Sequence, residues 1–142
     1  MVQLSPDSET GHVIRDSQRW AAGYRHSDPT IEGFSHTHLS GAGHSDLGDV
    51  LVIPAAGDRA PLEPGDAAKP GSGYRSRFSH ADEVARPGYH AVTLSDAHVR
   101  AELTAGTRAG VHRHRFPRAA MQARPSRTWA TQRPHSMSEG QP

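Results

Sequence analysis

The 142-residue chain contains no cysteine and few large apolar side chains. The absence of cysteine excludes a disulfide framework and any metal site built on thiolates. Leucine, isoleucine, valine and phenylalanine together number 21 of the 142 residues. That share lies below the roughly 20% under which chains often stay unfolded. The sequence therefore predicts either a small domain with a thin core or a piece of a larger one.

The chain also lacks a strong charge and a long apolar run. Its formal net charge is +1, so it does not belong to the highly charged disordered class. No apolar stretch approaches the ~20 residues of a transmembrane helix, and we expect no membrane span. The arginines after residue 117 are scattered, without a helical or RGG pattern, and predict a solvated tail that binds no nucleic acid.

Fourteen glycines and 11 prolines punctuate the sequence and disfavour long helices. Between them lie short segments with β-branched or aromatic residues, at spacings typical of an antiparallel sandwich or barrel. The sequence therefore predicts a mainly β fold, with residues 54–72 as a loop. The predicted strands are Gly23–His26, Ile31–Leu39, Val50–Ile53, Tyr74–His80, His90–Leu94, Val99–Thr104 and Val111–Phe116.

Two of these strands carry a specific burial pattern. Val99, Ala101 and Leu103 share one face of their strand, which predicts that this face is buried. Val50–Ile53 is wholly apolar and is predicted to be buried on both faces. After Pro117 the alternation stops, so residues 118–142 are predicted to form an unstructured tail.

The run from Ile31 to Pro54 combines two close histidines, four glycines after a strand-like start, and carboxylates. His36 and His38 fall on one face of a strand, and His112 and His114 repeat that spacing. Paired histidines of this kind could bind zinc, but no spacing specifies the third and fourth ligands. Hydrogen bonding that shapes a binding-site wall, and a purely structural role, remain the other interpretations.

The turn that follows these histidines contains further candidates. Gly41 and Gly43 allow positive φ or close approach to a ligand, and Ser40 and His44 would lie beside them. Asp46 and Asp49 could offer oxygens to calcium or could cap the turn around Gly48. The carboxylates of Asp82 and Glu83 have no motif that assigns them catalysis. Aromatic residues that could stack on a sugar or fill the core are Trp20, Tyr24, Phe34, Tyr74 and Tyr89.

Several blocks of the chain resemble one enzyme family. Gly33 to Gly41 reads Gly-Phe-Ser-His-Thr-His-Leu-Ser-Gly, and Gly43 to Asp49 fits Gly-x-x-Asp-x-Gly-Asp. Together with residues 1–7, 78–89 and 101–108, these blocks resemble the N-terminal domain of glycoside hydrolase family 92, the calcium-dependent exo-acting α-mannosidases. The resemblance covers residues 1–117 in order.

The resemblance implies an antiparallel β-sandwich of the galactose-mutarotase-like supersandwich type. Residues 1–117 would be a partial copy of this domain, with at least one early strand missing. A frameshift would explain the change of composition over residues 118–142. The family's α-helical barrel domain, which carries the general acid, the general base and most calcium ligands, is expected to be absent.

The resemblance also implies a function, the hydrolysis of terminal α-mannosyl linkages by inversion in a parent enzyme. In this chain it implies no catalytic or metal-binding residue, a calcium ion held mostly by the missing domain, and inactivity of the chain alone. The expected partners are mannose-containing glycans and the missing barrel domain, and the parent is expected to be secreted, periplasmic or at the cell surface. Alternatives are a stand-alone carbohydrate-binding module and a non-functional gene-model fragment. The substrate-binding residues implied by the match are His36, His38, Ser40, Gly41, His44 and Asp46.

Overall fold

The computed structural model describes residues 2–8, 23–36, 50–55 and 61–118, and the backbone of 129–130. The described strands form three antiparallel sheets, two of four strands and one of two. Sheet A has the order β1-β3-β4-β10, sheet B pairs β2 with β5, and sheet C has the order β6-β7-β8-β9. The strands are β1 (Leu4–Asp7), β2 (Thr30–Ile31), β3 (Gly33–His36), β4 (Val50–Val52), β5 (Ser76–Arg77), β6 (Val84–Arg86), β7 (Tyr89–Leu94), β8 (Val99–Ala105), β9 (Gly110–Arg115) and β10 (Trp129–Ala130).

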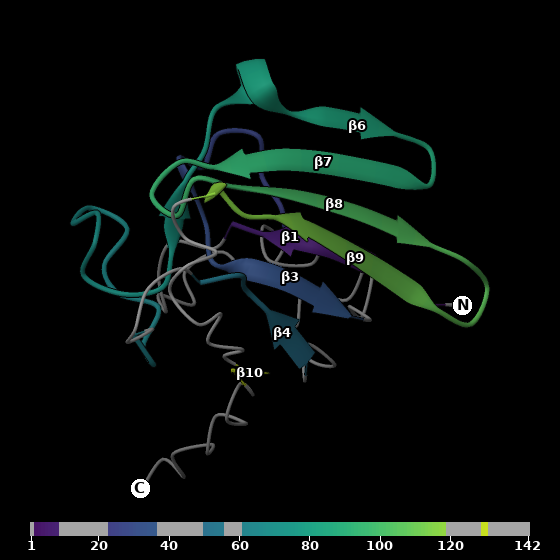
Figure 1. The fold of residues 1–142 in the computed structure, drawn as a ribbon, viewed down its shortest axis with the longest axis horizontal. Helices are drawn as coiled ribbons and strands as arrows, with labels where there is room; N and C mark the ends of the chain where they lie inside the picture. The colour runs from purple at the N-terminus through teal and green to yellow at the C-terminus, as the bar shows by residue number, and fades with distance from the viewer. Residues whose placement is uncertain (1, 9–22, 37–49, 56–60, 119–128, 131–142) are drawn as a thin grey trace, which may run out of the picture.

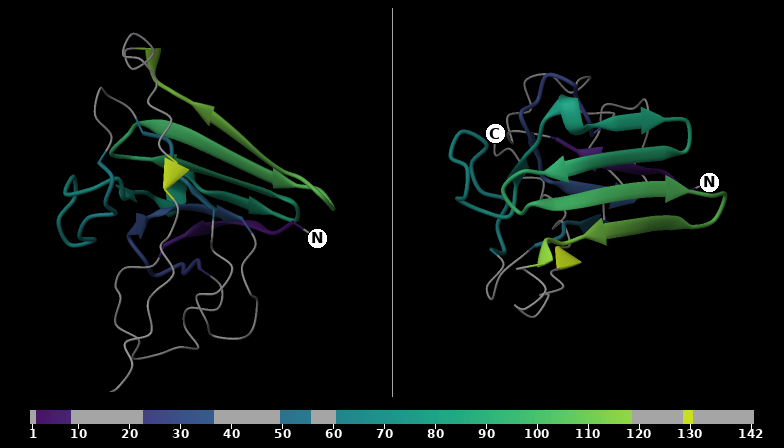
Figure 2. Two further views of the ribbon diagram at one scale, coloured as in Figure 1. Left: turned by 90° about the horizontal axis from the view of Figure 1, so that it is seen from below. Right: turned by 45° about the horizontal axis from the view of Figure 1, so that its top comes forward.

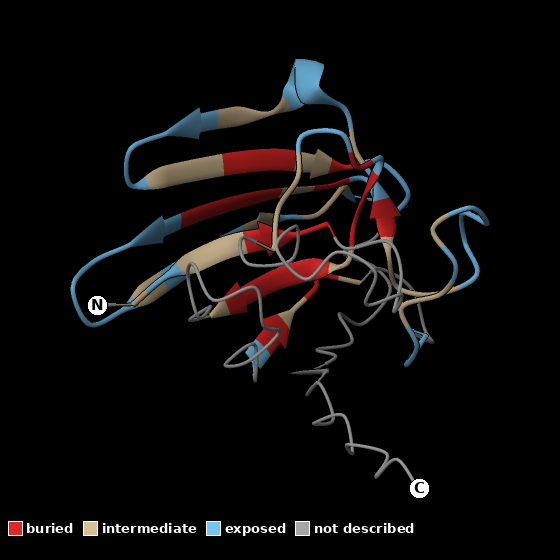
Figure 3. Cartoon of the chain, turned by 180° about the vertical axis from the view of Figure 1, so that it is seen from behind, coloured by how far each residue is buried: buried red, intermediate tan, exposed pale blue. Residues whose placement is uncertain are grey.

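Sheets A and C lie as two layers with an apolar core between them (Figure 2). Phe34 of β3, with Ile31 and Ile53, supplies one side of the core. Strands β7 and β8 supply the other through inward-facing aliphatic side chains. Buried segments of β3, β7 and β8 face this interior, whereas the edge strands of sheet C, β6 and β9, contain exposed residues (Figure 3). The arrangement is a β-sandwich, and the predicted mainly β antiparallel fold class is confirmed.

Strand β8 confirms the predicted alternation. Val99 and Ala101 are fully buried and Leu103 is 2% exposed, because this face packs on the core. On the other face Thr104 is exposed, but Glu102 is only 8% exposed. The carboxylate of Glu102 accepts hydrogen bonds from Tyr89 and Arg113, which compensate its removal from water.

Strand β4 differs from its prediction of burial on both faces. Leu51 is 1% exposed, whereas Val50 is 45% exposed. In the register with β3, Val50 lies opposite His36 at the start of β4 and shares its face, whereas Leu51 lies opposite Ser35 on the other face of sheet A. The apolar character of Val50 therefore does not report burial.

Three other predicted strands are divided, shortened or absent. The described part of Ile31–Leu39 is divided at Glu32, because β2 ends at Ile31 in sheet B and β3 begins at Gly33 in sheet A. Gly23–His26 is not a strand, because Gly23 takes φ 69° and the chain turns there. In Tyr74–His80 only Ser76–Arg77 is a strand. Ser79 instead caps the 3₁₀ turn η2 (His80–Asp82), since its hydroxyl accepts the backbone N–H of Ala81.

Three strands had not been predicted. Strand β1 contains Pro6 and lies at the edge of sheet A among the described strands, a position that tolerates proline. Strand β6 forms the corresponding edge of sheet C. Strand β10 lies within residues 118–142, which were predicted to be unstructured. It pairs with β4 through backbone hydrogen bonds, and the sequence shows no strand pattern there.

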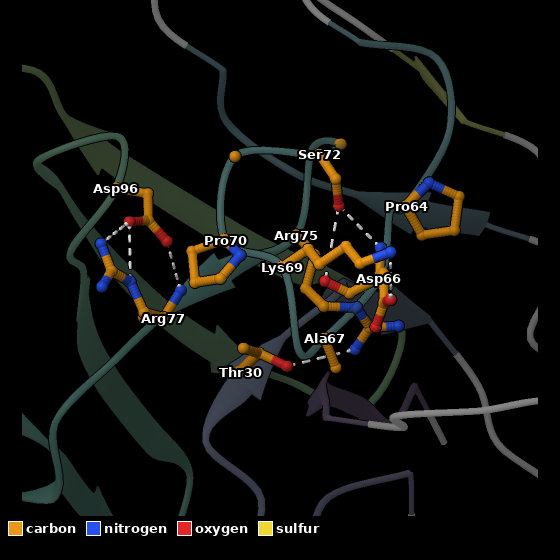
Figure 4. A pocket seen from close by; sticks show the side chains of 12 residues that line it. Thr30, Pro64, Asp66, Ala67, Lys69, Pro70, Ser72, Arg75, Arg77 and Asp96 are labelled. Carbon is orange, nitrogen blue, oxygen red and sulfur yellow. Dashed lines mark hydrogen bonds and ion pairs between the residues drawn. The ribbon is translucent and has the colours of Figure 1, made fainter.

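Residues 54–55 and 61–72 are the described part of the predicted loop, and local hydrogen bonds hold its second half. Asp66 N–H donates to Ser72 Oγ, and Tyr74 N–H donates to the carbonyl of Glu63. Nearby, Arg77 donates to the carboxylate of Asp96 and so joins sheet B to the turn after β7 (Figure 4). Among the described residues there is no helix long and apolar enough to cross a membrane.

Replacing Phe34, the largest fully buried side chain, tests the sandwich core. Phe34→Ala should lower the free energy of unfolding by about 3–5 kcal/mol, because it leaves a cavity between the sheets. Val111→Ala, at a position 54% exposed, is the control and should change it by less than about 0.5 kcal/mol. Urea unfolding followed by circular dichroism measures both. Equal effects of the two substitutions would contradict the observed packing.

Candidate functional site

Of the six predicted substrate-binding residues, only His36 lies among the described residues. It is the last residue of β3. The other five, His38, Ser40, Gly41, His44 and Asp46, lie outside the described residues, as does Asp49. The described site is therefore the framework from which the glycine-rich segment 37–49 begins.

His36 is held by a histidine of the opposite sheet. Its Nε2 lies 2.8 Å from Nε2 of His112, and the two rings stack with centroids 5.0 Å apart. At this distance the N–H of one ring donates a hydrogen bond to the unprotonated Nε2 of the other. This contact fixes the end of β3 against β9 and thereby the origin of the segment 37–49.

The sequence suggested His36 with His38, and His112 with His114, as pairs along a strand. The structure instead joins one histidine of each pair, because β3 and β9 face each other across the sandwich. His114 lies on the same side of β9 as His112, and both rings contact Phe34.

The histidines are not brought together as a zinc site within the described residues. No group of three or more histidine, aspartate or glutamate side chains there has the arrangement of a metal site. The 2.8 Å separation of His36 and His112 is a normal hydrogen-bond length. A hydrogen bond is compatible both with shaping a binding-site wall and with a purely structural role.

The His112 ring is easier to keep neutral than an ordinary histidine. Its burial, together with the neighbouring His36 and His114, lowers the pKa of His112 from 6.5 to about 4. Burial also lowers the pKa of His114. Protonation of both rings of the His36–His112 pair would place two cations in contact and leave no acceptor nitrogen, so the hydrogen bond requires at least one neutral ring.

A second polar cluster surrounds Glu83 on the opposite side of the core. Its carboxylate, 10% exposed, accepts hydrogen bonds from Tyr24 Oη at 2.9 Å, His80 Nδ1 at 2.6 Å and His90 Nε2 at 2.9 Å. Burial opposes ionisation of this carboxyl, but the donors His90, His80 and Tyr24 outweigh it and lower the pKa of Glu83. The group is therefore a carboxylate fixed by three side-chain donors.

The contacts of His80 identify its charge. Nδ1 faces the Glu83 carboxylate, and Nε2 faces the backbone carbonyl of His26 at 2.6 Å. Both partners only accept hydrogen bonds, so both nitrogens must carry protons and His80 is an imidazolium. The bond to Glu83 raises the pKa of His80 accordingly. The ring of His26 stacks on it at 3.8 Å.

Sequence reasoning missed this cluster. The four side chains come from positions 24, 80, 83 and 90, and no motif joins them. The i, i+3 spacing of His80 and Glu83 was the available signal, since a single helical turn places such residues side by side. The sequence predicted strand at His80, which would have separated them.

The aromatic candidates divide between core and cluster. Phe34 is fully buried in the core, and Tyr74 packs against it. Tyr24 and Tyr89 bond carboxylates through their hydroxyls. Trp20 lies outside the described residues.

Comparison with known proteins identifies the family. The profile of the "Glycosyl hydrolase family 92 N-terminal domain" matches residues 1–138. The chain belongs to glycosyl hydrolase family 92. The match extends past Pro117, where the sequence analysis placed the end of the domain. A search of curated proteins found no match.

Solved structures of the family agree with the fold. The chain is similar to the family GH92 α-mannosidase BT3965 from Bacteroides thetaiotaomicron in complex with mannoimidazole, with 46% identity and a TM-score of 0.72. A second structure of this enzyme gives 47% identity and the same TM-score. The matches cover 82% of this chain but only 14% and 15% of those chains. The chain therefore spans about one seventh of the enzymes that it resembles.

The His36–His112 pair predicts a pH dependence of stability. The unfolded chain takes up a proton at His112 near pH 6.5, whereas the folded chain does so only near pH 4. The free energy of unfolding should therefore fall as the pH is lowered through this window. Urea unfolding at several pH values measures the slope. His112→Phe keeps a ring but cannot titrate, so its slope should be smaller, and an unchanged slope would contradict the account.

The Glu83 cluster predicts a local stability effect. Glu83→Gln leaves the protons of His80 and Tyr24 without their carboxylate acceptor, and should lower the free energy of unfolding by about 1–3 kcal/mol. Glu63→Gln, the same change at an exposed position, is the control and should have little effect. Thermal unfolding near pH 7 compares them. A loss as small as that of the control would show that the cluster contributes nothing to the fold.

Proposed function

We propose that this chain forms part of the N-terminal, mannose-facing wall of an exo-acting α-mannosidase. The observation that carries the proposal is the family profile over residues 1–138. It is supported by 46% identity to an α-mannosidase solved with the ligand mannoimidazole. In the parent enzyme the substrate would be a mannose-containing glycan, and the reaction would be hydrolysis of its terminal α-mannosyl linkage.

Within this wall we assign the sugar contacts to segment 37–49 and its anchor. His36 is held by His112, and the chain continues from it into His38, Ser40 and Gly41. A fixed starting point limits the conformations of the segment, so less ordering is required when a sugar binds. His44 and Asp46 would also contact the sugar.

The acid and base for the reaction would lie outside this chain. Inverting hydrolysis needs a protonated carboxylic acid, usually with a raised pKa, and a second carboxylate that activates water. The partly buried carboxyl groups of Glu83 and Glu102 instead have lowered pKa values, about 2 for Glu102, because arginine, histidine and tyrosine side chains donate to them. Groups of this kind do not serve as general acids near neutral pH.

We also place the calcium ion of the parent outside the described part of this chain. Calcium prefers six to eight oxygen ligands, chiefly carboxylates and carbonyls. The described residues include no cluster of three or more acidic or histidine side chains fit for a metal. The described residues therefore do not fit a calcium ion.

A chimera tests the proposal. Residues 1–138 would replace the corresponding segment of the Bacteroides thetaiotaomicron α-mannosidase, and hydrolysis of an aryl α-mannoside with calcium would be measured. The chimera should be active, whereas this chain alone should show no hydrolysis. Activity of the chain alone, or a folded chimera without activity, would contradict the proposal.

A substitution in the chimera tests the assigned contacts. His38→Asn should lower kcat/KM by about tenfold or more, because it removes a group that holds the sugar. His98→Asn is the matched control, since His98 is exposed, has φ 52°, and asparagine tolerates that conformation. Equal kcat/KM in both variants would refute the assignment to segment 37–49 without refuting the family function.

A further inference from the structure

A cavity lies between the two sheets, and its lining includes Leu4, the residue of β1 that pairs with His36. Strand β1 lies against β8 and β3 lies against β9, so β6 and β7 extend sheet C beyond the described edge of sheet A (Figure 1). The cavity, of about 540 Å³, occupies this overhang. This volume falls within the roughly 300–1,000 Å³ of small-molecule sites. The cavity beside the loop of Figure 4 measures about 10 Å³, enough for about one water.

One wall of the large cavity is polar and held in place. Tyr24, His80, Glu83 and His90 all line it, and they are the members of the Glu83 cluster. They come from the segment before β2, from η2 and its C-terminal cap, and from β7. Side chains fixed by mutual hydrogen bonds from separate elements form a pre-organised surface, which lowers the ordering needed when a ligand binds.

The polar wall is left with one unsatisfied nitrogen. His90 donates through Nε2 to Glu83, so in the neutral ring Nδ1 is an acceptor. That Nδ1 is buried and has no hydrogen-bond partner among the described residues. A buried polar atom without a partner costs about 1–3 kcal/mol. A hydroxyl group that reached it as the His90 ring adjusted would supply the missing donor.

The remaining walls are mostly apolar. Leu4 and Pro6 of β1 face Leu103 and Ala105 of β8, and Ala85 of β6 lies at the edge. The negative charge of Glu83 is matched by the imidazolium of His80, and the exposed guanidinium of Arg86 on β6 adds hydrogen-bond donors and one positive charge at the rim. An apolar floor opposite a neutral hydrogen-bonding wall suits a ring that carries C–H groups on one side and hydroxyls on the other.

We propose that the cavity between β1 and β7 is a second binding site, for a neutral polyhydroxylated ring of monosaccharide size. The site is defined by described residues alone and does not depend on the proposed function. Its ligand would lie with its C–H face on Leu103 and Ala105, and its hydroxyls toward His90 and Glu83.

Ligand-observed saturation-transfer NMR on the full chain tests the site. Methyl α-mannoside and methyl α-glucoside are the polyol probes, cyclohexanol is the ring without the hydroxyl set, and inorganic phosphate is the anion probe. Both glycosides should bind and the other two should not. Preferential binding of phosphate or cyclohexanol would overturn the ligand class, and no binding of either glycoside to a chain with dispersed amide signals would overturn the site.

Cavity-filling variants locate the binding. Ala85→Phe introduces a large side chain into the cavity from an exposed position, and should weaken glycoside binding about tenfold or more. Ala109→Phe, the same change in the exposed turn before β9, should leave binding unchanged. Ala105→Leu is a second filling variant if Ala85→Phe does not fold, and it should also weaken binding.

Comparing glycoside binding in the His38→Asn variant and in the cavity-filling variants distinguishes this second site from the sugar contacts of the proposed function. Binding that is lost in His38→Asn but kept in Ala85→Phe and Ala105→Leu would assign the sugar to segment 37–49 and overturn the second site. Binding that is kept in His38→Asn and lost in the filling variants would support the second site, whatever the chimera shows.

Discussion

The contact between the inner faces of β3 and β8 is the interaction on which the rest of this structure depends. The chain has few large apolar side chains, and those that are buried gather where Phe34 and Ile31 meet Leu103 and Ala101. Burial of apolar surface is the main favourable contribution to folding, so a chain with few apolar side chains has only a small free energy of unfolding to lose. The two sheets are held together by this one layer of side chains.

Both polar clusters are positioned by that layer. His36 and His112 meet because Phe34, two residues before His36 on the same face of β3, is packed against the same side of sheet C. On the other side of the core, β7 carries His90 in line with buried Val92 and Leu94, which aims the ring at Glu83. A change in the core would therefore move both clusters.

The sequence predicted the parts of the fold that are governed by local alternation. Val99–Thr104 and His90–Leu94 were recognised because their buried and exposed residues alternate, and the family blocks identified the sandwich. Burial of Val50 was mispredicted, because whether a strand is covered on both faces depends on the layer above it. Strand β10 was not predicted, because two residues are too few to show an alternation of buried and exposed side chains.

The candidate site was less predictable than the fold. The His36–His112 contact joins strands 76 positions apart, and the Glu83 cluster gathers side chains from three separate elements. Contacts of this kind depend on which strands face each other across the sandwich. The spacing of strands along the sequence does not predict that arrangement. His36 was selected through a family pattern, whereas Glu83 has no motif and was assigned to solvent or a turn. The structure gives it three donors instead.

Amide hydrogen exchange of the full chain tests directly whether the two sheets share one core. If they do, the buried amides of β3, β7 and β8 should exchange slowest and with similar protection, because exposing any of them requires separating the sheets. Phe34→Ala should then accelerate exchange in β7 and β8 as well as in β3. Strong protection of β7–β9 alongside rapid exchange of β3, or an effect of Phe34→Ala confined to β3, would show that sheet C folds alone and would contradict the account.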